Sequence, residues 1–376
     1  MKPSPLAAAL LCCALGASFQ WLTVRANYGG DRTALFLHGS QYPVPAGLAF
    51  EHIYVFPNSG GYDGQSYHYM AHDPLQRSDI GRAVPDPSLR YPRVLVPAMA
   101  HMLALGRPEW IDTAFFACNL FFLGIGAYWL AILLGRIGIQ PMYGALYVIT
   151  PVAIVSLDRM LVDLALASLA LGFAVYLNPE RAWRLYVILA AAPLCRESGF
   201  FLLAAWALYL TTKRRYRQVA LYATAGIPAV WWILWVRSRI PGAAALGLGV
   251  FVPFRGMIDA LTHPRISPFS TPVVAVIHVL YGLQVIGVLT GLSLPFRDWR
   301  KLAIDPVRTV CLLWAVYGIA LPPGIYDDPI SAPRILAPLL MFEFLRGQRL
   351  PLLLVAPRVW LELAPQVLGI LRAAVG

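Results

Sequence analysis

The sequence predicts an all-α fold, a polytopic transmembrane helical bundle of about 10–11 spans. Of the 376 residues, 59% are hydrophobic and only 13% are charged, whereas an average soluble domain carries roughly 25% charged residues. Mean hydropathy is +0.62. Apolar runs near the length of about 20 residues that crosses a bilayer recur at 6–24, 115–134, 219–236 and 273–294. So much apolar surface requires lipid as its solvent.

The first of these runs predicts a membrane helix over 5–24. Residues 1–20 also have features of a signal peptide, because Lys2 precedes an apolar stretch and small residues follow at 14–17. The apolar stretch nevertheless continues through Trp21, Leu22 and Val24. An uncleaved first helix is therefore the preferred interpretation.

Nine further helices follow from the apolar pattern. They are predicted at 113–134, 141–157, 161–177, 183–194, 199–212, 219–236, 271–294, 307–321 and 335–345. The final stretch, 350–375, contains Pro351, Pro357 and Pro365, and it is interpreted either as an interfacial helix or as an eleventh span. We treat 1–376 as a single transmembrane domain.

The positive charge lies in short loops between the helices. Lysine and arginine number 30 against 19 acidic residues, a net charge of +11. With the N-terminus inside, the loops assigned to the inside contain Arg136, Arg181, Arg184, Lys213, Arg214, Arg215, Arg217, Arg297, Arg308, Arg346 and Arg349. Such loops are typical of the cytoplasmic side of a membrane. We therefore expect membrane lipids around the chain and no nucleic-acid partner.

The same topology makes 25–92 the first extracytoplasmic loop and gathers other ionisable residues toward the outer side. These residues are Asp63, Asp73, Asp158, Asp163, Glu197, Asp327, Asp328, Arg90, Arg93, Arg159, Arg196 and Arg334. Charged groups that converge at membrane depth usually line a substrate site or pathway. The alternative is that they are ordinary solvated loop charges.

The densest polar signal lies at 60–74, where glycines flank Tyr62 and Asp63. Glycines at such positions predict a tight turn in which the backbone approaches a ligand closely. Tyrosines near a membrane surface are often only an aromatic belt. A belt does not explain a carboxylate between glycines.

A helix that starts at Gly64 places Gln65, Tyr69 and Asp73 on one face, by their i, i+4 spacing. Together with Tyr67 they are candidates for sugar binding. Aromatic rings stack on the apolar face of a pyranose, while amide and carboxylate groups bind its hydroxyls. For Tyr67 and Tyr69 the belt interpretation stays open.

The motif reads Tyr62-Asp63-Gly64-Gln65-x-Tyr67-x-Tyr69-x-Ala71-x-Asp73-Pro74 and is followed by Arg90-Tyr91-Pro92-Arg93. It resembles the first outer loop of bacterial multi-spanning proteins of the GT-C glycosyltransferase superfamily, including mannosyltransferase-like members. The resemblance implies a sugar donor carried on a polyprenyl phosphate and a glycan, lipid or protein acceptor. It also implies a site that faces outward from the bacterial inner membrane. Many GT-C enzymes carry adjacent acidic residues in this loop, whereas here the next acid after Asp63 is Asp73.

The resemblance implies that an acidic residue of this loop is the catalytic base, and Asp63 is the candidate. Arginine binds phosphate oxygens through two parallel hydrogen bonds, so Arg90, Arg93, Arg196 and Arg334 are candidates for the donor phosphate. Further candidates for substrate contact are Tyr62, Asp158, Arg159, Glu197 and Tyr326. No cofactor or metal is expected. Asp327 and Asp328 could hold a divalent cation, but two adjacent carboxylates alone do not indicate one.

Structural pairing is the alternative for several of these charges. Arg196 and Glu197 lie in an apolar setting, where a bare pair is costly, and they could pair with Asp158 or Arg159 to fix helix packing. Arg334 and its neighbours could instead cap the last outer loop.

Two other function classes compete with a glycosyltransferase. A transporter or flippase for a lipid-linked or polar solute usually has ionisable residues near the midplane, on broken helices in paired halves. A non-catalytic membrane scaffold with a GT-C-like fold is favoured by the missing second carboxylate beside Asp63. Placement of the charges toward the outer ends favours the enzyme.

Overall fold

The chain folds almost entirely into helices. The computed structural model describes residues 4–177, 182–240, 252–263, 270–297 and 304–375, and it is 77% helical. Among these residues, 4 helices are long and apolar enough to cross a membrane, or up to 6 if each of two bent pairs is one span. The predicted all-α polytopic class is therefore confirmed.

The four long apolar helices are regular over most of their length. They are α1 (Pro5–Asn27), η3 with α6 (Pro108–Trp110 and Ile111–Arg136), α11 with η7 and α12 (Tyr216–Ala223, Thr224–Gly226 and Ile227–Arg239), and α14 (Thr271–Arg297). The Ser4 side chain caps α1 by accepting a hydrogen bond from the Ala7 amide. Pro5 then occupies the first turn, where its missing N–H group is not needed.

Two further apolar segments are broken. The 3₁₀ helix η4 (Pro141–Ile149) meets α7 (Pro151–Arg159) at 49°, and α19 (Leu350–Glu362) meets α20 (Ala364–Val375) at 57°. Pro151 lacks the N–H group that would continue a helix from η4. The last stretch is thus a bent pair, and Asn27 of α1 donates to the Gln366 carbonyl across 3.2 Å.

Among the described residues, fewer helices qualify as candidate spans by length and composition than the about 10–11 spans expected from apolar length. α8 (Asp163–Val175), α9 (Ala182–Cys195) and α15 (Pro306–Ala320) are apolar but shorter than 18 residues. The other helices of this part are η6 (Glu197–Gly199), α10 (Phe200–Thr212), α13 (Arg255–Thr262), α16 (Pro323–Asp327), α17 (Ser331–Ile335) and α18 (Ala337–Leu345). Hydropathy reports the apolar length of a segment and does not report where its backbone breaks.

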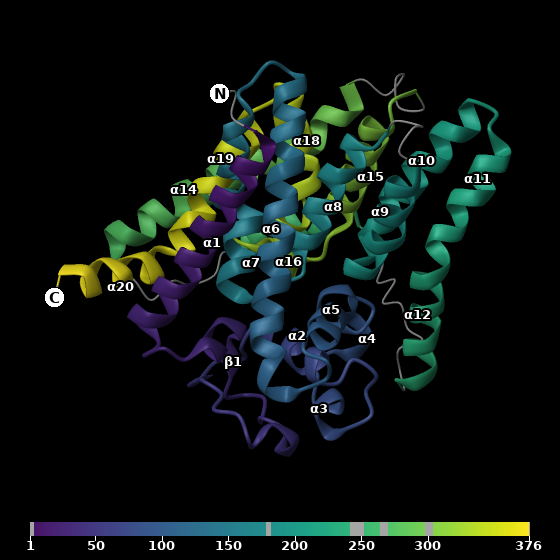
Figure 1. Cartoon of the computed structure of the whole chain (residues 1–376). Helices are drawn as coiled ribbons and strands as arrows, with labels where there is room; N and C mark the ends of the chain where they lie inside the picture. Colours follow the sequence, from purple (N-terminus) through teal and green to yellow (C-terminus); the bar gives the residue numbers. More distant parts are fainter. Residues whose placement is uncertain (1–3, 178–181, 241–251, 264–269, 298–303, 376) are drawn as a thin grey trace.

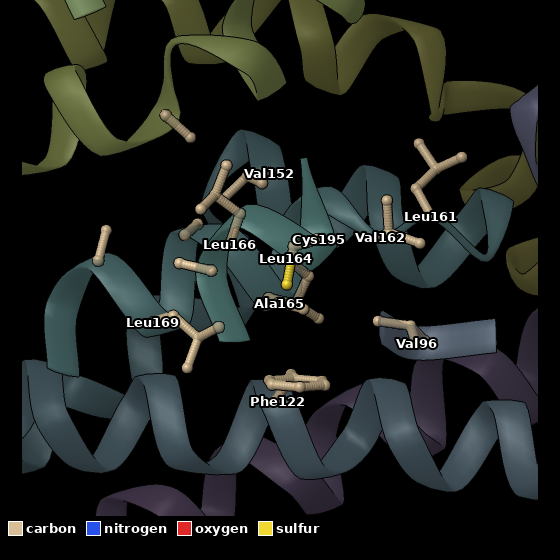
Figure 2. Packing of buried hydrophobic residues seen from close by; sticks show 14 of the residues in the cluster. Val96, Phe122, Val152, Leu161, Val162, Leu164, Ala165, Leu166, Leu169 and Cys195 are labelled. Carbon is tan, nitrogen blue, oxygen red and sulfur yellow. The ribbon is translucent and has the colours of Figure 1, made fainter. Parts of the chain in front are cut away.

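The core forms where α6, α7 and α8 pack together. Every residue of α8 from Asp163 to Phe173 is buried, and Figure 2 shows Phe122 of α6 below Ala165 and Leu169 of α8. Contact between α6 and its neighbours is close at Gly126, where a Cβ atom would lie 2.4 Å from the Ser168 hydroxyl. This rigid core fixes the N-terminus of α8.

The polar segment after α1 folds into a separate layer at one end of the bundle (Figure 1). Its elements are η1 (Arg32–Phe36), β1 (His38–Gly39), η2 (Ala46–Leu48), β2 (Val55–Phe56), α2 (Asp63–His72), α3 (Asp79–Arg82) and α4 (Pro87–Arg90), and α5 (Leu95–Leu103) follows them. β1 and β2 are parallel, with His38 opposite Val55. We call this layer, residues 25–92, the polar loop.

The basic junction between α10 and α11 and the N-terminus lie at the same end of the bundle. The polar loop lies at the other end (Figure 1). Lys213 to Arg217 belong to this junction. Such a separation is what the predicted topology requires, while its direction relative to the cell stays a prediction. Arg181 and residues 298–303 lie outside the described residues.

Candidate functional site

Asp63 lies at the start of α2 between two arginines. Its Oδ1 is 2.7 Å from Nη2 of Arg90 in α4, and its Oδ2 accepts a hydrogen bond of 2.7 Å from Nη2 of Arg334 in α17. Asp63 therefore contacts two of the four arginines that are candidates for the donor phosphate, Arg90 and Arg334. The side chain of Asp63 keeps 12% of its surface exposed.

Asp163 is a second carboxylate of the same cluster, predicted from the sequence to lie among the outer charges but not among the candidate site residues. It begins α8 and is 2% exposed. Arg334 donates to it through Nη1 across 2.9 Å, and Arg196 donates to its other oxygen. Arg334 therefore joins Asp63 to Asp163. The sequence did contain a signal for Asp163. It is a carboxylate at the start of an apolar helix, and the predicted topology puts it on the same side of the membrane as Asp63.

The resulting chain of ion pairs, which we call the arginine bridge, consists of Arg90, Asp63, Arg334, Asp163 and Arg196. Each of the three guanidinium groups contacts one or both of the two carboxylates, so the bridge as a whole carries a net charge of +1. In addition, the Nε atoms of all three arginines are buried and find no acceptor among the described residues. Unsatisfied guanidinium donors at a surplus of positive charge are suited to bind an anion such as phosphate.

The arginines keep Asp63 ionised. Burial opposes the charged form, but Arg334 and Arg90 outweigh it and hold the pKa of the Asp63 carboxyl well below its usual range. A carboxylate with so low a pKa is a poor proton acceptor. Its basicity can rise only when another anion engages the two arginines.

Tyr62 holds Arg334 in place. The Tyr62 ring lies 4.6 Å from the Arg159 guanidinium carbon and 5.2 Å from that of Arg334, distances at which a cation is attracted to an aromatic face. Its hydroxyl donates to Oδ2 of Asp328 across 2.5 Å. Burial raises the pKa of the Tyr62 hydroxyl above its ordinary value, so it stays a donor. Tyr62 therefore links the polar loop to the segment between α16 and α17.

The predicted pairing of Arg196 and Glu197 with Asp158 or Arg159 is wrong. Arg196 pairs with Asp163, Glu197 lies 3.4 Å from Arg93, and Arg159 lies 3.5 Å from Asp158. The reason is that α9 ends at Cys195 and Arg196 is extended, with φ −160° and ψ 153°. Extended backbone turns Arg196 toward the start of α8 instead of α7.

Several predicted sugar-binding residues have structural contacts instead. Gln65 accepts from the Gly39 amide and donates to the Gly60 carbonyl, and Asp73 accepts from the Arg77 and Ser78 amides. The Tyr326 hydroxyl donates to the Gly318 carbonyl across 2.6 Å. None of these contacts reaches the arginine bridge. Gln65, Asp73 and Tyr326 thus have roles in local folding, and their contact with a substrate stays a prediction.

Tyr67 and Tyr69 are both buried, at 0% and 1% exposure. Tyr67 lies against Arg93, and the Tyr69 hydroxyl is 3.3 Å from Nδ1 of His38. Neither ring is at the protein surface, so neither belongs to an aromatic belt in this structure, and sugar contact by either ring stays a prediction. Each ring instead packs α2 against the rest of the polar loop.

The glycines around Tyr62 and Asp63 are explained by contacts within the protein. Gly61 has φ +70°, which favours glycine. A Cβ atom on Gly64 would lie 2.4 Å from the Arg159 carbonyl oxygen and 2.7 Å from that of Phe36. The close approach predicted for a ligand is thus made by backbone, and it seats the start of α2 against the end of α7.

Four side chains that the sequence analysis did not select meet along α2. They are Glu51, His68, His72 and Asp112, whose ligand atoms all lie within 4.8 Å of one another. The signal in the sequence was the His-x-x-x-His spacing, which places both imidazoles on one helix face. Among the described residues this is a group able to hold a metal ion.

No protein-family model matches the chain, and neither a curated protein nor a solved structure matches it. The comparisons therefore assign no family. The GT-C resemblance of the polar loop stays a prediction.

Proposed function

We propose that this membrane protein is a glycosyltransferase of the GT-C type, which transfers a sugar from a polyprenyl-phosphate donor to a glycan, lipid or protein acceptor outside the bacterial inner membrane. One observation carries the proposal. The candidate base, Asp63, shares Arg334 with Asp163 in a cluster that has one more guanidinium than carboxylates. A carboxylate beside surplus phosphate-binding groups is the pair of functions that such a transfer needs.

The donor phosphate would bind to the arginine bridge. Its oxygens would accept hydrogen bonds from Arg334 and Arg90, whose Nε atoms find no acceptor among the described residues. Arg196 extends the positive surface on the far side of Asp163. The polyprenyl chain would run along the apolar helices in the surrounding lipid. Phosphate then competes with Asp63 for the same guanidinium groups.

That competition links donor binding to catalysis. When the phosphate engages Arg334 and Arg90, their charge no longer holds the Asp63 pKa down, and the carboxylate becomes a stronger base. Asp63 then takes the proton of the acceptor hydroxyl as that oxygen bonds to the sugar C1. The bond between C1 and the phosphate oxygen breaks, and its electron pair leaves with the phosphate, whose developing charge the arginines stabilise.

The direct test is transfer of labelled sugar from polyprenyl-phosphate donors by the purified chain in lipid nanodiscs. Release of free polyprenyl phosphate together with a labelled acceptor is the expected result. Movement of a donor between leaflets without cleavage would support the transporter. Neither cleavage nor movement with any donor, by protein that is folded and monodisperse, would support the scaffold. Lipid analysis of a deletion strain shows which donor accumulates.

A further inference from the structure

The four residues of the histidine and carboxylate group come from three separate segments. Glu51 lies after η2, His68 and His72 lie on α2, and Asp112 lies in the first turn of α6. The His68 side chain has no exposed surface and that of His72 has 2%. Two imidazoles and two carboxylates thus converge where the polar loop meets a long apolar helix.

The two imidazoles are separated from each other and from the carboxylate oxygens beside them by distances near those of ligands around one tetrahedral ion. Nε2 of His68 lies 2.9 Å from Oδ1 of Asp112, 3.2 Å from Nε2 of His72 and 3.7 Å from Oε2 of Glu51. Nε2 of His72 lies 3.5 Å from the same Glu51 oxygen. A tetrahedral zinc ion with bonds of about 2.0–2.1 Å separates its ligand atoms by about 3.3 Å.

Protons on the two imidazoles do not give every ligand atom of this group a hydrogen bond. Oε2 of Glu51 and Oδ1 of Asp112 are buried, and neither has a hydrogen-bond partner of acceptable geometry among the described residues, although both face imidazole nitrogens. A single proton on Nε2 of His68 can point at only one of its three neighbours. One cation in the middle contacts all four atoms at once, and its double charge balances the two carboxylates.

Surrounding contacts orient the ligands as in metalloproteins. Nδ1 of His68 lies 3.0 Å from Nε2 of His38, and the Phe36 ring stacks on the His68 ring at 4.2 Å. A second hydrogen bond on the far nitrogen is what fixes the orientation of a metal-binding histidine. Glu51 and Asp112 also line a hollow of about 620 Å³ that opens to solvent, which gives an ion access.

We infer that Glu51, His68, His72 and Asp112 bind one zinc ion in a closed structural site. Two imidazoles favour zinc over magnesium or calcium, which prefer oxygen ligands. Four protein ligands leave no open coordination position, so the ion fastens the polar loop to α6 and takes no part in chemistry. It also fixes α2, on which Asp63 lies about 7.5 Å along the axis from His68. The inference is independent of the proposed transfer.

The test uses full-length protein purified through a tag without histidine and without chelator. Elemental analysis should find about one zinc ion per chain, and the melting temperature should fall when a chelator removes it and recover when zinc returns. His72→Gln and Asp112→Asn should lose at least about 10-fold in zinc affinity. The matched control is His52→Gln, because His52 adjoins Glu51 but contacts Asp31.

The result that overturns the site is folded wild-type protein that holds no transition metal and does not change its melting temperature with added zinc. Zinc that stays at the wild-type level in His72→Gln would equally overturn it, because the ion would then be bound elsewhere. If the purified protein held stoichiometric manganese or iron at the same residues, the assignment of zinc to the site would be wrong. If a variant fails to fold, the zinc titration of metal-free wild type decides.

Discussion

Arg334 and Asp63 are 271 residues apart in sequence, yet their side chains form a hydrogen bond of 2.7 Å. The other terminal nitrogen of Arg334 donates a hydrogen bond to Asp163 at the start of α8. One planar guanidinium thus fastens the polar loop to two places in the helical bundle. Because these bonds are also the ones a phosphate would replace, stability and donor binding depend on the same side chain.

Asp63→Asn is expected to lower sugar transfer by on the order of 10²–10⁴, the contribution typical of a general base. Asparagine keeps the size of the side chain and one acceptor oxygen, but it cannot take the proton of the acceptor. The measurement is transfer from a polyprenyl-phosphate sugar in nanodiscs, with each variant matched for folded protein.

Asp73→Asn is the control for Asp63→Asn, because Asp73 lies on the same short segment and, among the described residues, accepts hydrogen bonds from Arg77 and Ser78 of its own loop. Asparagine keeps the size of the side chain and one acceptor oxygen, so transfer should stay within about two-fold of wild type. Wild-type transfer by Asp63→Asn would remove the catalytic assignment and favour the transporter or scaffold.

Arg334→Lys should lower transfer by about 10–100-fold, although the charge is kept. Lysine cannot donate to Asp63 and Asp163 in the fixed fork of a guanidinium, and loss of one charge-assisted hydrogen bond is worth roughly 1.5–3 kcal/mol. The donor KM should rise. Arg255→Lys serves as the control, since Arg255 is exposed and its ion pair within the described part of the chain is with Asp259 of its own helix. Equal transfer by both variants would contradict a role for Arg334.

The pH dependence of transfer should differ between kcat/KM and kcat. In the free protein the two arginines depress the pKa of Asp63, so the ionised form is lost only as pH falls below its usual value of about 4. The kcat/KM profile should therefore show no acid limb from Asp63 between about pH 5 and 8. With donor bound, the pKa rises, and kcat should show an acid limb at higher pH. Coincident limbs in both profiles would contradict competition between phosphate and Asp63.

Hydropathy predicted on which end of the bundle Asp63 and Arg334 lie, because a helix that crosses the membrane carries its flanking charges to a definite side. It did not predict their partners. The pairing of Arg196 with Asp163 depends on the extended backbone after Cys195. No local sequence pattern predicts that conformation.

The histidine group was missed for a related reason. His68 and His72 form a visible His-x-x-x-His pair, but Glu51 and Asp112 reach them from other segments, so only half of the ligand set is visible as a spacing along the sequence. Gly64 was selected correctly as a position that demands glycine. Its neighbour, however, is the Arg159 carbonyl and not a ligand.

Single cysteines at Asn58 and Arg214 should be labelled from opposite sides of the membrane. Both positions are exposed, and they lie in the polar loop and in the basic junction between α10 and α11. An impermeant thiol reagent added to intact cells should reach Asn58→Cys and spare Arg214→Cys, because basic loops stay inside. Native Cys12, Cys118 and Cys195 are buried. The reverse labelling would invert the topology.

Gly64→Ala should destabilise the protein by about 1–3 kcal/mol, as expected when a methyl group is forced into a packed site. The new Cβ would lie 2.4 Å from the Arg159 carbonyl oxygen and 2.7 Å from that of Phe36, and backbone atoms cannot swing aside as a side chain can. The start of α2 would then move away from α7 and loosen the hold of Arg334 on Asp63. Gly282→Ala is the matched control, because nothing lies within 4 Å of a Cβ atom there and alanine favours the helix α14. Thermal unfolding in detergent measures the stability of both variants. Equal melting temperatures would mean that Gly64 is not tightly packed against Arg159 and Phe36.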